Sequence, residues 1–370
     1  YTGGVVGVND GTITKVKSSV QVTGYGTYTG GIAGINNETI QIANNSGVVS
    51  GGTNSEYVGG IAGFTNLNSL ILEAGNYGSV SGKTAGGIVG NFARGTLTNV
   101  YNVAQVNGSS FAGGLFGYKN TELETEANVS FAYNSGRVTG GSTGGIYGYM
   151  AEGLDNNFNN VYYLNTYSGN TAQVGADSKT LSELQNINTF ANFNFQEIWG
   201  IKTYDVAQTN FNNGLPFIWS VATWDNWNDY AVEEVVPDEN GIYHITTAEE
   251  LAWLSKQSNL TAGFADNKQF VIDNNINLYG HYFTPISHNQ TTSTDYSYAF
   301  NGEFDGNNKL IEGLTIEQNY VENINNMALF GIVGNALVTN VAMENTHIVV
   351  TSNSSNAASL AAIVSGTSTI

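Results

Sequence analysis

The sequence contains histidines and serines, which could serve in catalysis, and glycine-rich stretches, which could bind phosphate. The four histidines are His244, His281, His288 and His347, and none lies in an H-E-x-x-H or other metal-binding spacing. We therefore expect His244 and His347 to occupy ordinary strand positions. No G-x-S-x-G motif marks a nucleophilic serine. The G-G-x-x-G stretches lack the following helix and the lysine of a phosphate-binding loop.

The acidic residues offer one candidate metal site. Glu122, Glu124 and Glu126 alternate in the segment TELETE, which places three carboxylates on one face of a strand or loop. A weak calcium site is one interpretation, and a solvated loop is the favoured one. Calcium is therefore the single cofactor that the sequence suggests.

The remaining acids do not point to catalysis. Those of the first 165 residues are scattered, whereas glycosidases need paired carboxylates. The segment FDGNNK, residues 304–309, lacks the spacing of a calcium loop, and its D-G-N-N run predicts a tight turn. We expect no catalytic and no cofactor-binding residue, with a polysaccharide-degrading β-helix enzyme as the minor alternative.

Composition limits the class of protein. Only 11% of the 370 residues are charged, 30 acids oppose 11 lysines and arginines, and the formal net charge is −19. Nucleic acid and anionic membrane surfaces are unsuitable partners, because both require clustered basic residues. No stretch approaches the roughly 20 apolar residues of a membrane-spanning helix. The absence of cysteine excludes disulfide scaffolds and cysteine-ligated metals.

An internal repeat organises the first 165 residues. Gly-Gly pairs recur in YTGGVVG, YTGGIAG, YVGGIAG, TAGGIVG, FAGGLFG and STGGIYG. Between them lie a T-[IL]-x-x-V element and an N-x-G-x-V-x-G element, so one period of about 27 residues contains three short β segments. The glycines that we assign to the structural repeat are Gly3, Gly4, Gly30, Gly31, Gly59, Gly60, Gly86, Gly87, Gly113, Gly114, Gly144 and Gly145.

The repeat predicts an all-β fold, a parallel β-helix with one period per coil. Each segment is too short to be stable alone, and stacking on neighbouring coils supplies the core. Glycine suits positive φ or close backbone approach at the corners. Equivalent asparagines, namely Asn44, Asn76, Asn102 and Asn134, are expected to form side-chain amide ladders. Right-handed coiling is expected by analogy with known solenoids.

The motifs G-G-[IL]-x-G, T-[IL]-x-N and N-x-G-x-V-x-G resemble those of the GLUG-motif repeat proteins. The resemblance is close over residues 1–165 and recurs in another form over 241–370. It implies β-solenoid modules of large bacterial cell-surface proteins, usually described as adhesins. Because the chain opens and stops inside repeats, we expect a fragment of a longer exported protein with tandem modules.

The repeat stops near residue 166. Thr180 and Glu183 have capping-box spacing and predict a short helix over 180–187. Trp199, Phe211, Pro216 and Phe217 suggest an aromatic plug over the last coil. Residues 166–220 are thus predicted to cap the first solenoid, because a bare coil exposes strand edges.

Residues 221–240 hold six acids and no base, which predicts an exposed acidic linker. Trp224 and Trp227 within it suit either ligand binding or packing. Residues 241–370 then start a second solenoid module. A capping box at Thr247 and Glu250 predicts a cap helix over 247–258, followed by the first coils.

The expected function follows from the resemblance, since the residues themselves indicate only a rod. It is a non-enzymatic adhesin-like or stalk segment that presents a lateral face to a glycan or to a surface protein of a host or neighbouring cell. A purely structural spacer is the alternative. The residues expected to contribute to such a face are Tyr25, Tyr28, Tyr57, Tyr77, Tyr101, Tyr118, Tyr133, Tyr147 and Tyr149.

Overall fold

The computed structural model describes residues 1–52, 55–119, 127–151, 156–167, 169–195, 197–201, 211–223, 225–289, 295–318, 324–352 and 355–370. The chain divides into two compact units, residues 1–222 and 223–370. Parallel strands form a β-solenoid of about 11 turns with about 29 residues per turn. The predicted all-β solenoid is therefore confirmed, with turns slightly longer than the predicted 27 residues.

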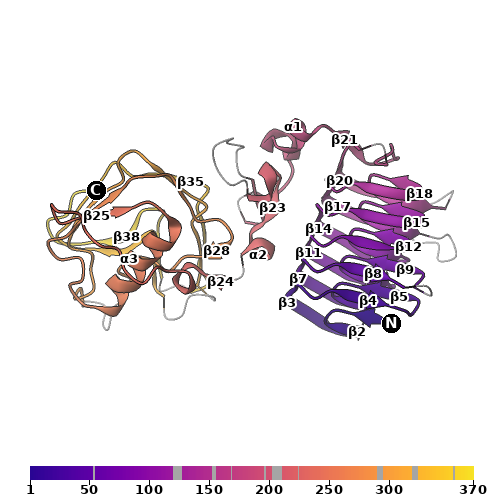
Figure 1. Cartoon of the computed structure of the whole chain (residues 1–370), viewed down its shortest axis with the longest axis horizontal. Coiled ribbons are helices and arrows are strands. Elements are labelled where there is room, and N and C mark those ends of the chain that lie inside the picture. The colour runs from indigo at the N-terminus through magenta and orange to yellow at the C-terminus, as the bar shows by residue number, and fades with distance from the viewer. Residues whose placement is uncertain are drawn as a thin grey trace. The chain divides into compact units, whose positions relative to one another are not determined.

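Three parallel sheets run along the first unit, and the colour gradient of Figure 1 follows its coils in sequence order. Sheet A contains β1 (Thr2–Gly3), β5 (Tyr28–Gly30), β9 (Tyr57–Gly59), β12 (Val80–Gly86), β15 (Val106–Gly113) and β18 (Val138–Gly144), together with β4 (Val22–Gly24) and β8 (Val49–Gly51). Sheet B contains β2 (Val6–Asn9), β6 (Ala33–Asn36), β10 (Ala62–Thr65), β13 (Val89–Phe92), β16 (Phe116–Lys119) and β19 (Tyr147–Met150).

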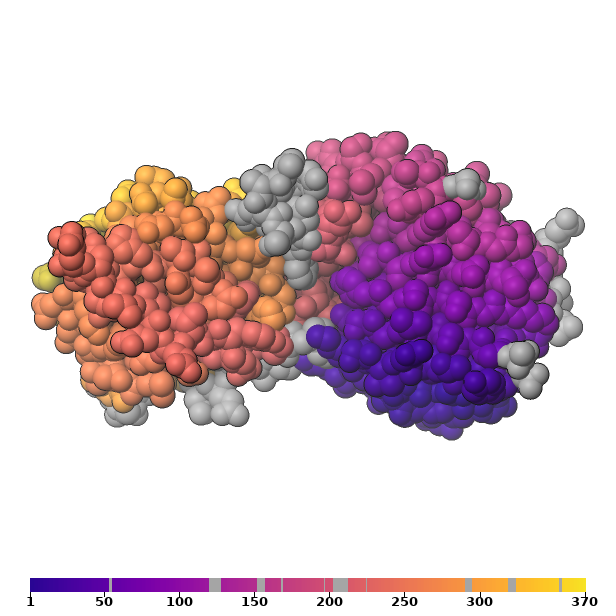
Figure 2. All heavy atoms as spheres, viewed as in Figure 1, coloured from indigo at the N-terminus to yellow at the C-terminus, as the bar shows by residue number. Residues whose placement is uncertain are grey.

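Sheet C is formed by the T-[IL]-x-x-V elements of successive coils. Its strands are β3 (Thr12–Ser18), β7 (Thr39–Asn45), β11 (Leu70–Asn76), β14 (Thr96–Asn102), β17 (Ala127–Asn134), β20 (Asn156–Leu164) and β21 (Asp177–Lys179). Equivalent apolar residues pair from coil to coil, as in Ile40 with Ile71 and Ile71 with Leu97. These three side chains are fully buried. In-register stacking thus builds the core, and Figure 2 shows the coils closing into a continuous surface.

The Gly-Gly pairs are required by close approach rather than by backbone conformation, since none of the twelve has a positive φ. A Cβ on Gly30 would lie 2.0 Å from the carbonyl oxygen of Ala33, across the bend between sheets A and B. A Cβ on Gly31 would lie 2.2 Å from the Gly60 oxygen and 2.6 Å from Cγ of Asn45. The first glycine therefore permits the bend, and the second makes room for an inward-pointing asparagine.

The predicted amide ladder exists, with one residue corrected. Asn45, Asn76, Asn102 and Asn134 form it, and each Nδ2 donates to the next Oδ1 at 2.7–2.8 Å. Asn44 does not belong to it: strand alternation turns the neighbouring residue inward, and the Asn44 side chain instead donates to the carbonyl of Val221 at 3.0 Å. All four ladder side chains are fully buried.

A second column runs through the middle of sheet C. One residue in each of six strands adopts a left-handed backbone conformation with φ between 50° and 56°, in the order Lys15, Ile42, Glu73, Asn99, Phe131 and Asn160. Pairing skips these positions, as between Gln41 and Ala43 of β7. This conformation is costly for a β-branched residue such as Ile42. The conformation recurs in six of the seven strands of sheet C whatever the residue type, so it belongs to the geometry of the coil.

The aromatic segment after the coils does not plug the last coil, and that prediction is wrong. The described residues between 181 and 222, here called the strap, run back along the outer face of sheet C (Figure 1). Its elements are α1 (Leu181–Leu184), η2 (Ile187–Phe190), β22 (Trp199–Gly200), η3 (Phe211–Gly214), β23 (Phe217–Ile218) and α2 (Trp219–Ala222). The predicted capping box at Thr180 is present, although α1 is shorter than the predicted helix.

The contacts of the strap follow the left-handed column in reverse order. Asn192 donates to Asn160 Oδ1 at 2.9 Å, and the indole of Trp199 donates to Asn99 Oδ1 at 3.0 Å. Farther along, Ser220 donates to Glu73 Oε2 at 2.7 Å. The outer face of sheet C carries Tyr101 and Tyr133, both fully buried beneath the strap, so burial of aromatic surface explains why the strap lies there.

The end of the last coil is covered instead by the described residues between 165 and 179. The Gln173 side-chain oxygen accepts from the backbone N–H groups of Ile146 and Tyr147 at 2.7 and 2.8 Å. Asn170 Oδ1 accepts from the N–H of Val138 at 3.0 Å. These two amide side chains replace the next coil, because they satisfy backbone donors that another strand would otherwise pair.

The second unit repeats the parallel stacking with longer coils. One sheet contains β25 (Ile242–Ile245), β26 (Gln269–Ile272), β29 (Glu303–Asp305) and β34 (Leu337–Thr339). Further parallel sets are β27 (Ile276–Asn277), β30 (Leu310–Glu312) and β35 (Ala342–Glu344); β31 (Thr315–Glu317) and β36 (His347–Val349); β32 (Asn326–Met327) and β37 (Asn356–Ala357); and β33 (Phe330–Val333) and β38 (Ala361–Val364).

Helix α3 (Ala248–Leu260) corresponds to the predicted cap helix and begins at the expected capping box of Thr247 and Glu250. Its polar side chains satisfy the backbone of the segment that packs on it. Ser255 donates to the carbonyl of Thr284 at 2.5 Å, and Asn259 accepts from the N–H of His288 at 2.8 Å. The helix thus packs its apolar side chains in the core while its polar ones hold residues 284–289.

The segment predicted as an exposed linker, residues 221–240, is only partly so. Strand β24 (Asp225–Asn226) pairs with β28 (His281–Tyr282), and η4 (Trp227–Asp229) follows it. Trp227 is buried and its indole donates to the carbonyl of Leu278 at 3.0 Å, so this aromatic packs in the core of the second unit. Glu233, Glu234 and Glu239 are exposed, as the acidic composition predicts.

Candidate functional site

Seven aromatic rings form a stripe on the outside of the first unit, where sheets A and B meet. We call it the aromatic stripe; its members are Tyr1, Tyr28, Tyr57, Phe64, Phe111, Tyr118 and Tyr149. Strand alternation places them there. In β5, for example, Thr29 is fully buried whereas Tyr28 is half-buried with its ring outward.

The rings contact one another along the coils and across the two sheets. Along sheet A, Tyr28 stacks on Tyr1 at 5.7 Å and on Tyr57 at 5.6 Å between ring centroids. Along sheet B, Tyr118 stacks on Tyr149 at 5.0 Å. Across the bend, Tyr28 lies 4.7 Å from Phe64. The stripe is therefore one connected aromatic surface and not a set of separate side chains.

The stripe is amphipathic and accessible. Tyr1 is 64% exposed and Tyr149 38%, and the other five rings are half-buried. Burial, followed by the nearby Tyr1 and Glu56, raises the pKa of the Tyr28 hydroxyl. That hydroxyl is therefore neutral at physiological pH and available as a hydrogen-bond donor and acceptor. Beside the stripe, Lys83 pairs with Glu56 at 3.1 Å.

Of the nine tyrosines predicted for a binding face, four belong to the stripe: Tyr28, Tyr57, Tyr118 and Tyr149. Tyr77, Tyr101 and Tyr133 lie on sheet C instead, where the Tyr77 and Tyr101 hydroxyls are 2.6 Å apart. Tyr147 packs on Phe116 of the core, and Tyr25 is 67% exposed. The sequence prediction missed Tyr1, Phe64 and Phe111, which register analysis would have found because they occupy the same outward positions.

The predicted calcium candidates Glu122, Glu124 and Glu126 lie outside the described residues. Within the described part of the chain, no group of three histidine, cysteine, aspartate or glutamate side chains could hold a metal ion. The turn predicted at FDGNNK is confirmed: Asn307 and Asn308 have φ of 50° and 55°, and Asp305 Oδ1 accepts from the N–H of Asn307 at 2.8 Å.

The histidines occupy contrasting environments. His244 lies in β25 and His347 in β36, as predicted. The His244 ring is exposed and hydrogen-bonds Asp273 at 2.8 Å, which raises its pKa. His288 and His347 are buried, and burial lowers the pKa of each to about 4. His281 hydrogen-bonds Asp225 between the rings of Trp227 and Tyr230.

A polar groove lies on the second unit. It crosses the starts of β26, β29 and β34 and has a volume of about 440 Å³. Its lining is mostly amide, hydroxyl and charged side chains, so it differs in chemistry from the aromatic stripe.

These features define the class of protein: a β-solenoid with a lateral aromatic surface. Comparison with known proteins adds no narrower assignment, since no family model, curated protein or solved structure matches the chain. The resemblance to GLUG-motif proteins therefore stays a prediction. Among the described residues, no helix is both long and apolar enough to cross a membrane.

Proposed function

We propose that this chain is a non-enzymatic, adhesin-like module of a bacterial cell surface that binds a glycan along the aromatic stripe. The observation that carries the proposal is the stripe itself, seven connected rings on the outside of a regular solenoid. Tyrosine offers a flat apolar face with a polar edge, which suits sugar rings that have apolar faces and hydroxyl rims.

The framework beneath the stripe favours a binding role. Large apolar patches on the surface of a protein commonly mark interaction sites. The stripe rests on strands whose positions are set by the buried asparagine ladder and by a buried valine column, Val22, Val49, Val80, Val106 and Val138, which pair from coil to coil. Its rings therefore need little ordering when a ligand binds. The resemblance of the repeat to bacterial surface modules supports the proposed location.

The test is a glycan array probed with the full chain, with and without calcium, followed by titration of the best ligand. We expect Tyr28→Ala and Tyr118→Ala each to weaken binding about threefold to tenfold, taking the roughly 0.5–1.5 kcal/mol of a contact between two rings as the scale. Tyr25→Ala is the matched control, because Tyr25 is strongly exposed and stacks on none of the stripe rings in the described part of the chain.

Equal losses for all three variants would contradict the assignment of the stripe. Failure to bind any glycan would favour a spacer role. Turnover of a glycan would overturn the non-enzymatic assignment.

A further inference from the structure

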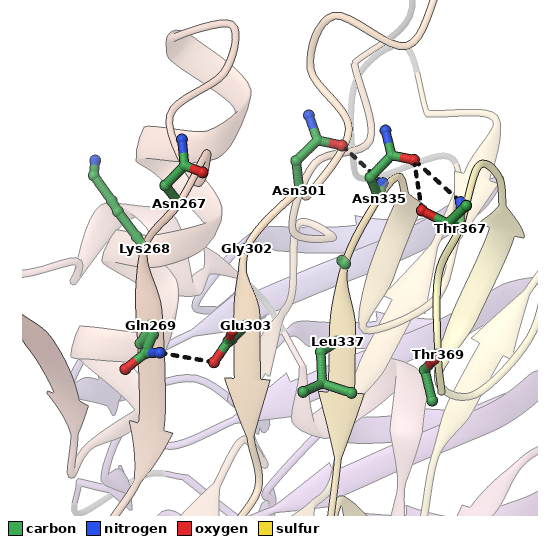
Figure 3. Close-up of a pocket in the computed structure, with 11 residues that line it drawn as sticks. Asn267, Lys268, Gln269, Asn301, Gly302, Glu303, Asn335, Leu337, Thr367 and Thr369 are labelled. Carbon is green, nitrogen blue, oxygen red and sulfur yellow. Dashed lines mark hydrogen bonds between the residues drawn. The ribbon is translucent and has the colours of Figure 1, made fainter.

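The polar groove of the second unit is built from equivalent positions in successive coils (Figure 3). One row holds Asn267, Asn301, Asn335 and Thr367. A second row holds Gln269, Glu303, Leu337 and Thr369, with register pairs linking Gln269 to Glu303, Glu303 to Leu337 and Leu337 to Thr369. The groove thus presents a polar group at almost every coil, and it runs in the direction in which the coils stack.

The orientation of two rim amides is fixed by backbone donors. Asn301 Oδ1 accepts from the N–H of Asn335 at 3.2 Å, and Asn335 Oδ1 accepts from the N–H of Thr367 at 3.1 Å. A backbone N–H can only donate, so the oxygen must face it and the NH₂ group must face away. Figure 3 shows the amide nitrogens of Asn267, Asn301 and Asn335 pointing to the same side. The rim is therefore a row of hydrogen-bond donors.

The lower row supplies acceptors. Gln269 Nε2 donates to Glu303 Oε2 at 2.8 Å, and both side chains are exposed. This hydrogen bond turns the Gln269 carbonyl oxygen and the second Glu303 oxygen toward other partners. Leu337, at the next coil, is 40% exposed and adds an apolar patch.

The charges around the groove nearly cancel. The Lys268 ammonium lies 3.6 Å from the centre of the Phe264 ring, which holds it at the rim. Lys268 and Glu303 are the two charged residues among the residues that line the groove, and Asp266 lies beside the rim, where it accepts from Asn301 at 2.9 Å. A surface with alternating donors and acceptors and little net charge suits a neutral, hydroxyl-rich ligand better than a polyanion.

We propose that this groove is a second glycan site, which binds a neutral linear oligosaccharide parallel to the solenoid axis. It works by hydrogen bonding, whereas the aromatic stripe works by stacking, and the two proposals are independent. Four coils separated by about 4.8 Å give a site about 14 Å long, which is the length of a short oligosaccharide. Sugar units beyond this length would lie outside the groove, so they should add little to the affinity for the oligosaccharide.

The test is calorimetric titration of the full chain with cello- and malto-oligosaccharides, from the disaccharides to the hexasaccharides. We expect affinity to rise up to about the tetrasaccharide in one series and then to level off. The double variant Gln269→Val with Glu303→Val removes both acceptors together, so that neither side chain is left unpaired, and valine suits a strand. It should weaken binding at least about tenfold, since two hydrogen bonds contribute about 1–3 kcal/mol.

Two controls locate the site. Thr339→Val changes the other end of β34, outside the groove, and should leave affinity unchanged. Tyr118→Ala removes a stripe ring and should also leave it unchanged. The proposal is overturned if no oligosaccharide of either series binds, or if the double variant binds as well as the original chain. Binding that is lost only in Tyr118→Ala would assign the glycan to the stripe and refute the groove.

Discussion

The buried asparagine ladder allows a quantitative test of what stabilises the coils. Asn76 lies in the middle of it and makes three side-chain hydrogen bonds: it accepts from Asn45 at 2.8 Å and donates to Asn102 at 2.7 Å and to the Gly78 carbonyl at 2.9 Å. Replacing Asn76 by alanine removes all three and leaves three buried partner groups. The perturbation is confined to the interior, because Asn76 is fully buried.

The magnitude follows from those partners. An unsatisfied buried polar group costs about 1–3 kcal/mol. Asn45 still donates to Gly47 and Asn102 still accepts from the Ala104 N–H, which places each penalty toward the lower limit. We therefore expect Asn76→Ala to lower the free energy of unfolding by about 3–4 kcal/mol. The total free energy of unfolding of a protein is about 5–15 kcal/mol. Because the expected loss is smaller than this total, the variant should still fold.

Hydrogen exchange measured by mass spectrometry in increasing urea is the appropriate assay, because peptides from β11 and β14 report on the first unit and those from residues 223–370 serve as an internal reference. Asn66→Ala is the matched control. Asn66 belongs to an exposed column, where it donates to Asn37 at 3.2 Å, and its loss should cost below about 1 kcal/mol. Equal costs for the two variants would refute the view that buried amide pairing stabilises the stack.

Three further perturbations test other features of the fold. Gly60→Ala should lower the free energy of unfolding by about 3 kcal/mol, because its Cβ would lie 2.1 Å from the Gly87 oxygen. The control Gly11→Ala should be nearly neutral, because a Cβ there meets nothing within 4 Å. Thermal denaturation measures both. Lys15→Asn should stabilise the first unit by up to about 1 kcal/mol, since asparagine tolerates the left-handed backbone that Lys15 adopts; a lower melting temperature would count against this reasoning. Acidification from pH 7 to pH 5 should lower the free energy of unfolding of the second unit by about 2 kcal/mol through His288 alone. The pKa of His288 is about 4 in the folded chain and about 6.5 in the unfolded chain, so the unfolded chain takes up the proton first. Stability therefore falls as the pH drops through about 6.5. His288→Leu should reduce this pH dependence, measured by urea unfolding at the two pH values, and an unchanged slope would disprove it.

The repetitive parts of the fold were predictable because each residue type recurs at one structural position. The Gly-Gly pairs and the apolar residues between them predict the coils and their core without knowledge of any contact. The ladder prediction failed at Asn44 by a single position, since Asn44 and Asn45 are adjacent asparagines and only strand alternation decides which one points inward. Local patterns such as the two capping boxes at Thr180 and Thr247 were equally readable.

The non-repeating parts were harder, because their positions depend on tertiary contacts. Trp199 and Phe217 predict burial but not the surface that buries them, and the sequence favours the end of the last coil over its side. Similarly, the acids around Trp227 suggest a linker although the tryptophan itself packs in a core. Four of the seven residues of the aromatic stripe were predicted from the sequence. Tyrosine recurrence indicates a face, whereas sorting outer from covered tyrosines requires knowing where the strap lies.

The strap changes how this solenoid should respond to mechanical load. A simple stack of coils can unravel from one end, since each coil contacts only its neighbours. Here Asn192 holds Asn160 in β20, while Ser220 holds Glu73 in β11 and Val221 accepts from Asn44 in β7. One continuous segment therefore ties distant coils together from the side. A pull on the chain should therefore meet a single rupture of the strap before any large extension.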